Sequence, residues 1–161
     1  MEKDCGAYIH ILSNRLKARL NSAIQDQGIT GVQSRFIFYI LNHSKDGPVF
    51  QRDLENVFGI GRSTATGVLN LMEKNGIIVR ESVSTDGRLK RLVPTKKAEE
   101  LDAKVRESFR ETDRILTKGL SEEDILKFKE VAQIMTENLE EHLNTTKCDF
   151  HEEKAWKNCI K

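Results

Sequence analysis

The 161-residue sequence lacks the features of a membrane or exported protein. Its longest uninterrupted apolar run, residues 36–41, is far shorter than the roughly 20 residues that a membrane-spanning helix needs. The N-terminal segment MEKDCGAY has neither the basic stretch nor the apolar stretch of an export signal. Three sparsely spaced cysteines do not indicate a disulfide framework. We therefore expect a cytoplasmic protein with no membrane partner.

The sequence also lacks the residue groupings of common enzymes. It contains no Ser/His/Asp grouping, no phosphate-binding loop and no paired His–carboxylate motif, and its four histidines are scattered. Cys148, His151 and Cys159 are of residue types that bind zinc, but their spacing fits no standard closed site. We predict no enzymatic activity, no cofactor and no metal, and we interpret residues 145–161 as a frayed or partner-dependent tail.

Charged residues, by contrast, are plentiful and unevenly distributed. The formal net charge of the whole chain is only +1. Residues 60–97 carry eight basic and three acidic side chains, a net charge of +5, whereas residues 98–161 carry a net charge of −5. A local positive excess of this kind is what phosphate binding needs. The segment around residues 60–97 is therefore the candidate nucleic-acid-binding part.

Residues 62–75 predict an amphipathic helix with an unusual polar face. Its apolar residues recur at i, i+3, i+4 and i+7 and share an inward face: Ala65, Val68, Leu69 and Met72. Its opposite face carries small polar residues and one cation: Ser63, Thr66, Gly67, Asn70 and Lys74. An exposed helical glycine costs about 1 kcal/mol relative to alanine, so Gly67 suggests close approach to a DNA groove. An ordinary solvated helix with an incidental glycine is the alternative.

Residues 77–83 and 89–95 predict two strands joined by a hairpin. Both runs are rich in Ile, Val and Thr, and the Asp86-Gly87 pair between them is a strong hairpin signal. Three cations, Arg88, Lys90 and Arg91, lie at or near the tip, as suits insertion into a minor groove. A solvated edge protected against aggregation is the alternative. With helices expected at 51–58 and 62–75, the hairpin predicts a helix-turn-helix followed by a wing.

Long amphipathic helices flank this unit. The first is expected over residues 4–27, and Thr30 with Gln33 forms a capping box for a largely apolar second helix ending near Asn42. Two more are expected, from Thr95 to Gly119 and from Ser121 onward. The last has a coiled-coil-like seam: Ile125, Phe128, Ala132, Met135 and Leu139. Since this apolar surface exceeds what one winged helix covers, we infer pairing with a second copy; an intramolecular helical hairpin is the alternative.

Two segments, QRDLENVFGIGRSTATGVLNLMEKNGII and DGRLKRLVPT, resemble the winged helix of the multiple-antibiotic-resistance regulator (MarR) family. Asp86-Gly87-Arg88 matches the wing signature of that family, and residues 62–66 match the start of its recognition helix. The resemblance covers roughly residues 5–144, with departures at Pro94 and Ala98. It implies a mainly α fold with a small β-wing. The implied boundaries are one domain over residues 1–144, with a DNA-binding part at 30–95 and dimerisation helices at 1–29 and 96–144.

A two-fold dimer would place two recognition helices about one DNA turn apart, ~34 Å, so we predict a near-palindromic duplex target. The residues assigned to DNA binding are Gln51, Arg52, Arg62, Ser63, Thr64, Thr66, Gly67, Asn70, Lys74, Asp86, Arg88, Lys90 and Arg91. In this assignment Arg88 enters the minor groove and Asp86 orients Arg88 or a nearby cation.

The resemblance also implies a repressor that a small lipophilic or phenolic compound releases from DNA. The candidate pocket residues are Leu12, Leu16, Phe36 and Tyr39. Plain core packing is the alternative for Phe36 and Tyr39. Some relatives sense oxidants through a cysteine in the first helix, and Cys5 lies at a helix start near Lys3, which favours a reactive thiolate. A dimeric adaptor that binds protein through its winged helix is a further alternative.

Overall fold

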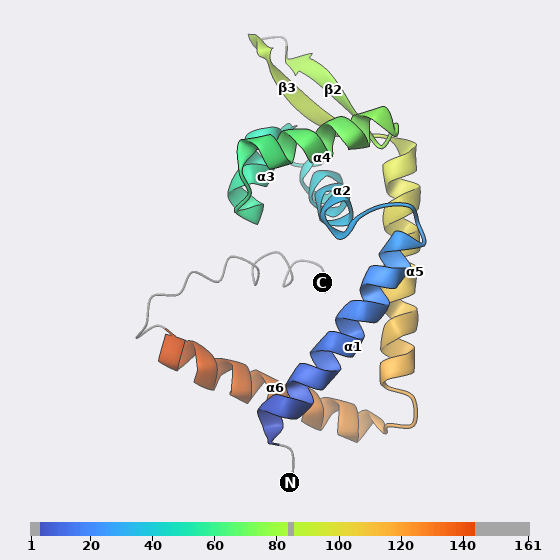
Figure 1. Ribbon diagram of the computed structural model, residues 1–161, viewed down its shortest axis with the longest axis vertical. Helices are drawn as coiled ribbons and strands as arrows, with labels where there is room; N and C mark the ends of the chain where they lie inside the picture. Colours follow the sequence, from blue (N-terminus) through green and yellow to red (C-terminus); the bar gives the residue numbers. More distant parts are fainter. Residues whose placement is uncertain (1–3, 84–85, 144–161) are drawn as a thin grey trace.

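The computed structural model describes residues 4–83 and 86–143, with residues 86–88 and 143 described in their backbone only. Six helices and three short strands follow one another along this part of the chain (Figure 1). In chain order they are α1 (Cys5–Gln25), α2 (Gly31–His43), β1 (Val49–Phe50), α3 (Gln51–Phe58), α4 (Arg62–Lys74), β2 (Ile78–Val83), β3 (Asp86–Pro94), α5 (Lys96–Leu116) and α6 (Glu122–Leu143). The architecture is therefore mainly helical with one small sheet.

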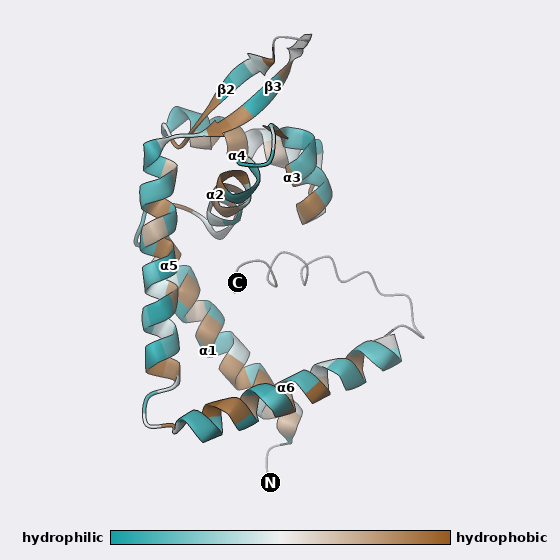
Figure 2. Ribbon diagram, turned by 180° about the vertical axis from the view of Figure 1, so that it is seen from behind, coloured by the Kyte–Doolittle hydropathy of each residue, from teal (hydrophilic) through white to brown (hydrophobic). Residues whose placement is uncertain are grey.

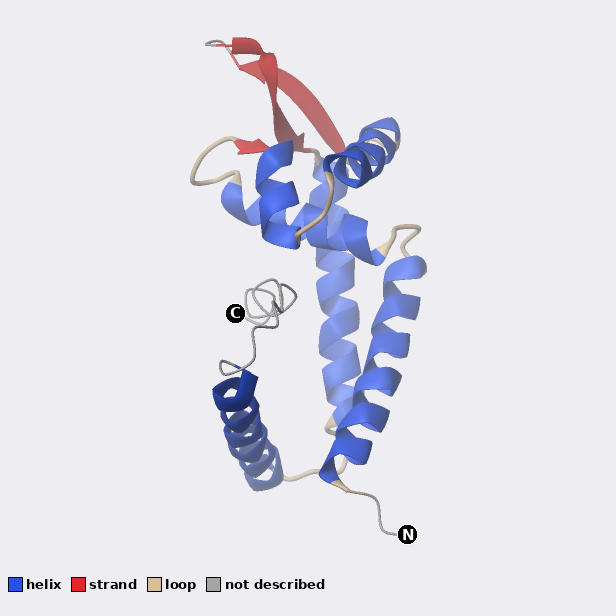
Figure 3. Cartoon of the chain, turned by 60° about the vertical axis from the view of Figure 1, so that its left-hand side comes forward, coloured by secondary structure: helices blue, strands red, loops and turns tan. Residues whose placement is uncertain are grey.

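The winged helix comprises α2, α3, α4 and the sheet, which lie together at one end of the molecule (Figure 3). The three strands are antiparallel in the order β1-β3-β2. The largest fully buried side chains all belong to this unit: Phe36, Ile37, Ile40, Leu54, Leu69, Met72, Ile77 and Ile78. The apolar faces expected from helical spacing in α2 and α4 thus meet in a single core.

Local sequence signals place the ends of several helices. Thr30 and Gln33 form the expected capping box, with the Gln33 N–H donating to Thr30 Oγ1 and the Thr30 N–H donating to Gln33 Oε1. Gly59 ends α3 in the left-handed region at φ 59°, and Gly119 separates α5 from α6 at φ 85°. These glycines take a conformation that L side chains rarely adopt, so the turns fall where the sequence predicts.

The tip of the hairpin differs from the sequence prediction. Asp86 and Gly87 were expected in the turn, but both belong to β3, and Asp86 pairs with Val83. The register between β2 and β3 shifts irregularly at Ser82/Val83. Asp-Gly favours a tight turn in isolation, but the ladder here continues further toward the tip. Strand β1 was also missed, because two residues are too short to produce an alternating pattern.

The junction between β3 and α5 accommodates both departures from the MarR pattern. Pro94 is the last residue of β3, opposite Ile78, and the next residue supplies the missing donor: the Thr95 N–H bonds the Ile77 carbonyl at 3.0 Å. A proline at a strand end removes no further ladder bond. The methyl group of Ala98 is fully buried. The junction therefore keeps its hydrogen bonds despite the unusual residues.

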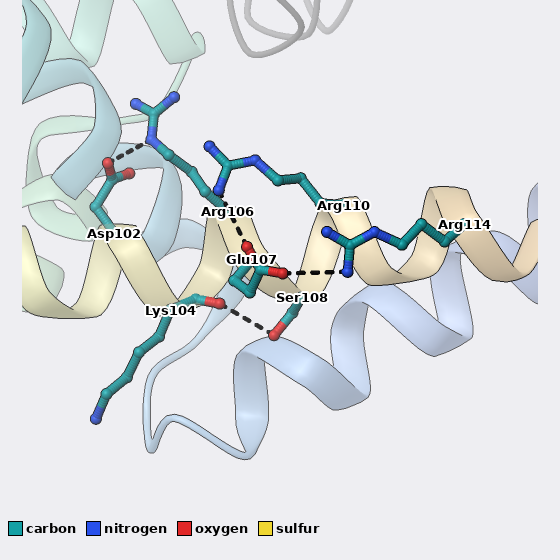
Figure 4. Close-up of polar contacts among 7 residues, drawn as sticks. All are labelled: Asp102, Lys104, Arg106, Glu107, Ser108, Arg110 and Arg114. Carbon is teal, nitrogen blue, oxygen red and sulfur yellow. Dashed lines mark hydrogen bonds and ion pairs between the residues drawn. The ribbon is translucent and has the colours of Figure 1, made fainter.

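Helices α1 and α5 lie side by side and extend away from the winged helix (Figures 1 and 3). Along α5, Arg106 pairs with Asp102 and lies over the ring of Phe38 in α2, while Arg110 and Arg114 share Glu107 (Figure 4). The Arg110 and Arg114 pairs are largely exposed, and such exposed pairs contribute little to stability. The burial of Leu101 and Val105 on the inner face holds α5 in place.

Helix α6 runs away from α5 at the far end of the molecule, and Figure 2 shows hydrophobic residues spaced along its ribbon. None of the described side chains of α6 is buried. Phe128 is 61% exposed and Leu139 is 64% exposed. The seam predicted from the sequence is therefore partly uncovered within one chain: Phe128 and Leu139 are exposed, while Ile125, Ala132 and Met135 are half-buried. No helix in residues 4–83 and 86–143 is both long enough and apolar enough to cross a membrane.

Candidate nucleic-acid interface

Helix α4 presents the face that the sequence assigns to DNA. Ala65, Leu69 and Met72 are fully buried against the core. The opposite side exposes Ser63, Thr64, Gly67, Asn70 and Lys74. A methyl group added at Gly67 would have no atom within 4 Å. Packing within the chain therefore does not require a glycine at residue 67. The glycine nevertheless weakens the helix relative to alanine.

The first turn of α3 contacts the first turns of α4 through Gln51. Its side-chain amide donates to Thr66 Oγ1 at 2.9 Å and to Glu55 Oε1 at 2.8 Å. The Thr66 hydroxyl donates in turn to the Arg62 carbonyl at 2.8 Å. Gln51 and Thr66, which the sequence treats as separate DNA contacts, thus form one hydrogen-bonded pair.

Two arginines lie at the helix starts next to this pair. Arg52 is in the first turn of α3, and Arg62 is the first residue of α4; both are exposed. Helix N-termini attract phosphate through their unpaired N–H groups, and a nearby guanidinium adds positive charge. This arrangement can bind the DNA backbone on either side of the α4 face.

Sequence reasoning missed Arg80 of β2. One of its terminal nitrogens donates to Asn70 Oδ1 at 2.7 Å and to Glu73 Oε2 at 3.1 Å, so it contacts the exposed face of α4 directly. The only signal in the sequence was a single cation within the apolar run that begins β2. Such a cation does not reveal that its partner is Asn70, ten residues earlier.

The wing, defined here as β2, β3 and their connection, carries two described cations on β3. Arg91 donates to Glu81 Oε2 at 3.0 and 2.7 Å, and Lys90 donates to the Ser82 hydroxyl. Both cations are exposed. The side chains of Asp86 and Arg88, the other predicted wing residues, lie outside the described part of the structure.

A family model described as MarR family matches residues 27–89. The solved structure of the transcription regulator MarR from Oenococcus oeni PSU-1 is 33% identical, and the match covers 83% of this chain and 99% of that chain with a TM-score of 0.54. The chain belongs to the MarR family. Its winged helix is that of the MarR transcription regulators, as the sequence resemblance predicted.

Two S. aureus structures share the fold of this MarR-family chain at lower identity. A MepR mutant bound to an oligodeoxyribonucleotide is 22% identical, covering 86% of this chain and 99% of that chain, with a TM-score of 0.71. MepR bound to ethidium bromide is also 22% identical, covering 85% of this chain and 97% of that chain, with a TM-score of 0.65.

The four predicted effector residues, Leu12, Leu16, Phe36 and Tyr39, were compared with two hollows on the surface. Two open hollows of about 330 and 420 Å³ occur among the described residues, and neither is lined by Leu12, Leu16, Phe36 or Tyr39. Phe36 is fully buried and packs on Phe58, with ring centroids 5.5 Å apart.

Tyr39 also belongs to this aromatic group, stacking on His43 at 4.0 Å. Burial, and secondarily the nearby Asp53 carboxylate, raise the pKa of the Tyr39 hydroxyl. Core packing therefore accounts for Phe36 and Tyr39 in this conformation.

Cys5 is exposed in the first turn of α1. Across the described ranges, no three His, Cys, Asp or Glu side chains gather in a way that could hold a metal ion. Cys148, His151 and Cys159, considered above as possible ligands, lie outside the described residues.

Proposed function

We propose that this MarR-family protein is a homodimeric repressor that binds a near-palindromic duplex operator and is released by a small molecule. The observation that carries the proposal is the exposed face of α4. It combines small polar side chains with a glycine that no packing contact requires. Exposed cations lie at the neighbouring helix starts, Arg52 and Arg62, and on the wing, Lys90. Small side chains allow an α-helix to approach base edges closely in a major groove.

Exposed apolar residues support the dimer. Beyond α6, they occur in the first turns of α1, where Tyr8 is 56% exposed and Ile9 51%, and near the end of α5, where Ile115 is 49% exposed. These elements lie at the end of the molecule away from the winged helix (Figure 1). A second copy would cover these side chains and hold two α4 helices in a defined spacing.

Two relatives support the DNA and effector parts of the proposal. The MepR mutant was solved with an oligodeoxyribonucleotide, and MepR itself with ethidium bromide, a flat lipophilic cation. A compound that changes the angle between two winged helices would disturb their spacing and weaken DNA binding. Residues Leu12, Leu16, Phe36 and Tyr39 remain our candidates for contacts to such a compound, in a conformation that opens the core around α2.

The test uses the full-length protein and duplex DNA from the region upstream of its own gene. We expect a dimer by sedimentation and a gel shift that weakens steeply as salt rises. We also expect Arg88→Ala to reduce affinity strongly, because a cation at the wing tip would enter the minor groove. A monomer that ignores duplex DNA at low ionic strength would refute the proposal.

A further inference from the structure

Arg80 links the wing to the exposed face of α4. Its guanidinium bonds both Asn70 and Glu73, which lie three residues apart on the same side of that helix. The Arg80 side chain is 22% exposed and that of Glu73 is 41% exposed. A second described ion pair of the wing, Arg91 with Glu81, is 50% and 45% exposed. Arg80 is thus the better shielded of the two wing arginines in these pairs.

The chemistry of this contact fixes the orientation of the Asn70 amide. A guanidinium can only donate hydrogen bonds, so the atom of Asn70 that it contacts must be the oxygen. Glu73 binds the same guanidinium nitrogen and so limits where Arg80 can move. Asn70 is an exposed residue, so its two amide N–H donors are available to a ligand, whereas its oxygen lies against the guanidinium.

We propose that Arg80 is a positioning residue that makes Asn70 a hydrogen-bond donor to DNA, so that one base pair of each half-site is read as G·C. The inference rests on the proposed function, because it requires α4 to enter a major groove. An asparagine reads adenine by using its oxygen and its N–H group together. The Asn70 oxygen has two lone pairs, but Arg80 occupies one of them and places a cation beside the other. A base that needs only donors from Asn70 then fits better, and guanine presents two neighbouring acceptors, N7 and O6.

Gln51 holds a second side chain of α4, that of Thr66, by a hydrogen bond in a similar way. The Thr66 hydroxyl accepts from Gln51 and donates to the Arg62 carbonyl. Thr66 and Asn70 are four residues apart and therefore adjacent on the helix surface. Two neighbouring side chains of α4 are thus held by partners outside the DNA, which reduces the conformational entropy lost on binding.

The experiment first determines the preferred half-site of the wild-type protein from a library of random duplexes. Binding of wild type and Arg80→Ala is then measured on duplexes that carry each of the four base pairs at every position. We expect Arg80→Ala to lower the preference for G·C about tenfold at one position of each half-site, with A·T gaining, because the released amide can bond adenine. A thermal melt confirms that the variant is folded.

Lys90→Ala is the matched control, because it removes an exposed cation from the same wing without touching Asn70. We expect the salt dependence of its binding, the slope of log K against log salt, to fall by about 2 for the two copies, with base preference unchanged. Arg80→Ala should show the reverse: an unchanged slope and an altered preference. A lower slope with unchanged preference in Arg80→Ala would overturn the proposal by making Arg80 a phosphate contact.

Asn70→Ala and the double variant complete the test. Asn70→Ala should lose the same G·C preference, and adding Arg80→Ala should then change it no further. If Asn70→Ala keeps the preference while Arg80→Ala loses it, Arg80 reads the base itself and the proposal is wrong. Wild-type protein that binds no duplex would instead refute the proposed function, and with it this inference, before any variant is compared.

Discussion

The winged helix and helix α6 place their apolar side chains in opposite environments. Phe36 in α2, Leu54 in α3 and Leu69 in α4 are fully buried within one chain, whereas Phe128 and Leu139 in α6 are more than half exposed. Both regions show clear helical amphipathicity in the sequence. The same amphipathic pattern can therefore close an internal core or leave an apolar surface for another molecule.

The largest expected effect is in the core. Phe36→Ala should lower the free energy of unfolding by about 3–5 kcal/mol, because it leaves a cavity among fully packed side chains. Urea denaturation measures the change. Leu71→Ala is the control, since Leu71 lies on α4 but is 47% exposed, and it should change stability by less than about 0.5 kcal/mol. Equal effects of the two variants would contradict the burial described here.

The second prediction concerns the uncovered seam of α6. Phe128→Glu should weaken dimerisation by about 2 kcal/mol or more, because a carboxylate would be buried in an apolar interface. Sedimentation over a range of concentrations measures the equilibrium. Gln133→Glu adds the same charge away from the seam and should leave the dimer intact. A dimer unaffected by Phe128→Glu would show that α6 does not form the interface.

The third prediction separates stability from binding on α4. Gly67→Ala should raise the free energy of unfolding by about 1 kcal/mol, because alanine favours the helix and has free space here. It should nevertheless weaken DNA binding, since the added methyl group keeps the helix away from the groove. Gly31→Ala in α2 meets equally open space and should leave DNA affinity unchanged. Unchanged affinity in Gly67→Ala would argue against close approach at this residue.

The smallest effect is expected at the start of α6. Hydrogen bonds from the Ser121 hydroxyl and backbone N–H to Asp124 lower the pKa of that carboxyl below its ordinary value of 3.8. Because the folded pKa is depressed, the ionised cap stabilises the folded state above the unfolded pKa. This contribution disappears as the pH falls through the folded pKa. Ser121→Ala should move the pKa of Asp124 back up, as measured by NMR titration of the carboxyl carbon; identical titrations would contradict this account of the cap.

Helix positions were largely predictable from the sequence. The prediction for α3, residues 51–58, agrees with its observed bounds, and that for α4 differs by one residue at its C-terminal end. The inward face of α4 and the cap at Thr30 were also correct. These features depend on residues within one or two helical turns of each other, where spacing and capping chemistry are strong signals.

Contacts between elements were not predictable in the same way. The short strand β1 becomes visible only when it pairs with β3, and the hairpin tip follows the ladder rather than the Asp-Gly signal. On the candidate DNA interface, Ser63, Gly67, Asn70 and Lys74 are exposed as expected, whereas Thr66 is half-buried beside Gln51. The hydrogen-bond partners of this face were not foreseen. Their consequence is functional, because a side chain that is already bonded presents different groups to a ligand.

The sequence by itself determined the local structure of this protein: which residues form helices, which sides of those helices are apolar, and where the net positive charge lies. These properties arise from neighbouring residues and from composition. Tertiary structure alone decided that Gln51 meets Thr66 across 15 residues and that Arg80 meets Asn70 across ten. Such contacts require two elements to pack at a particular angle, and that angle is set by the shared core rather than by either segment alone.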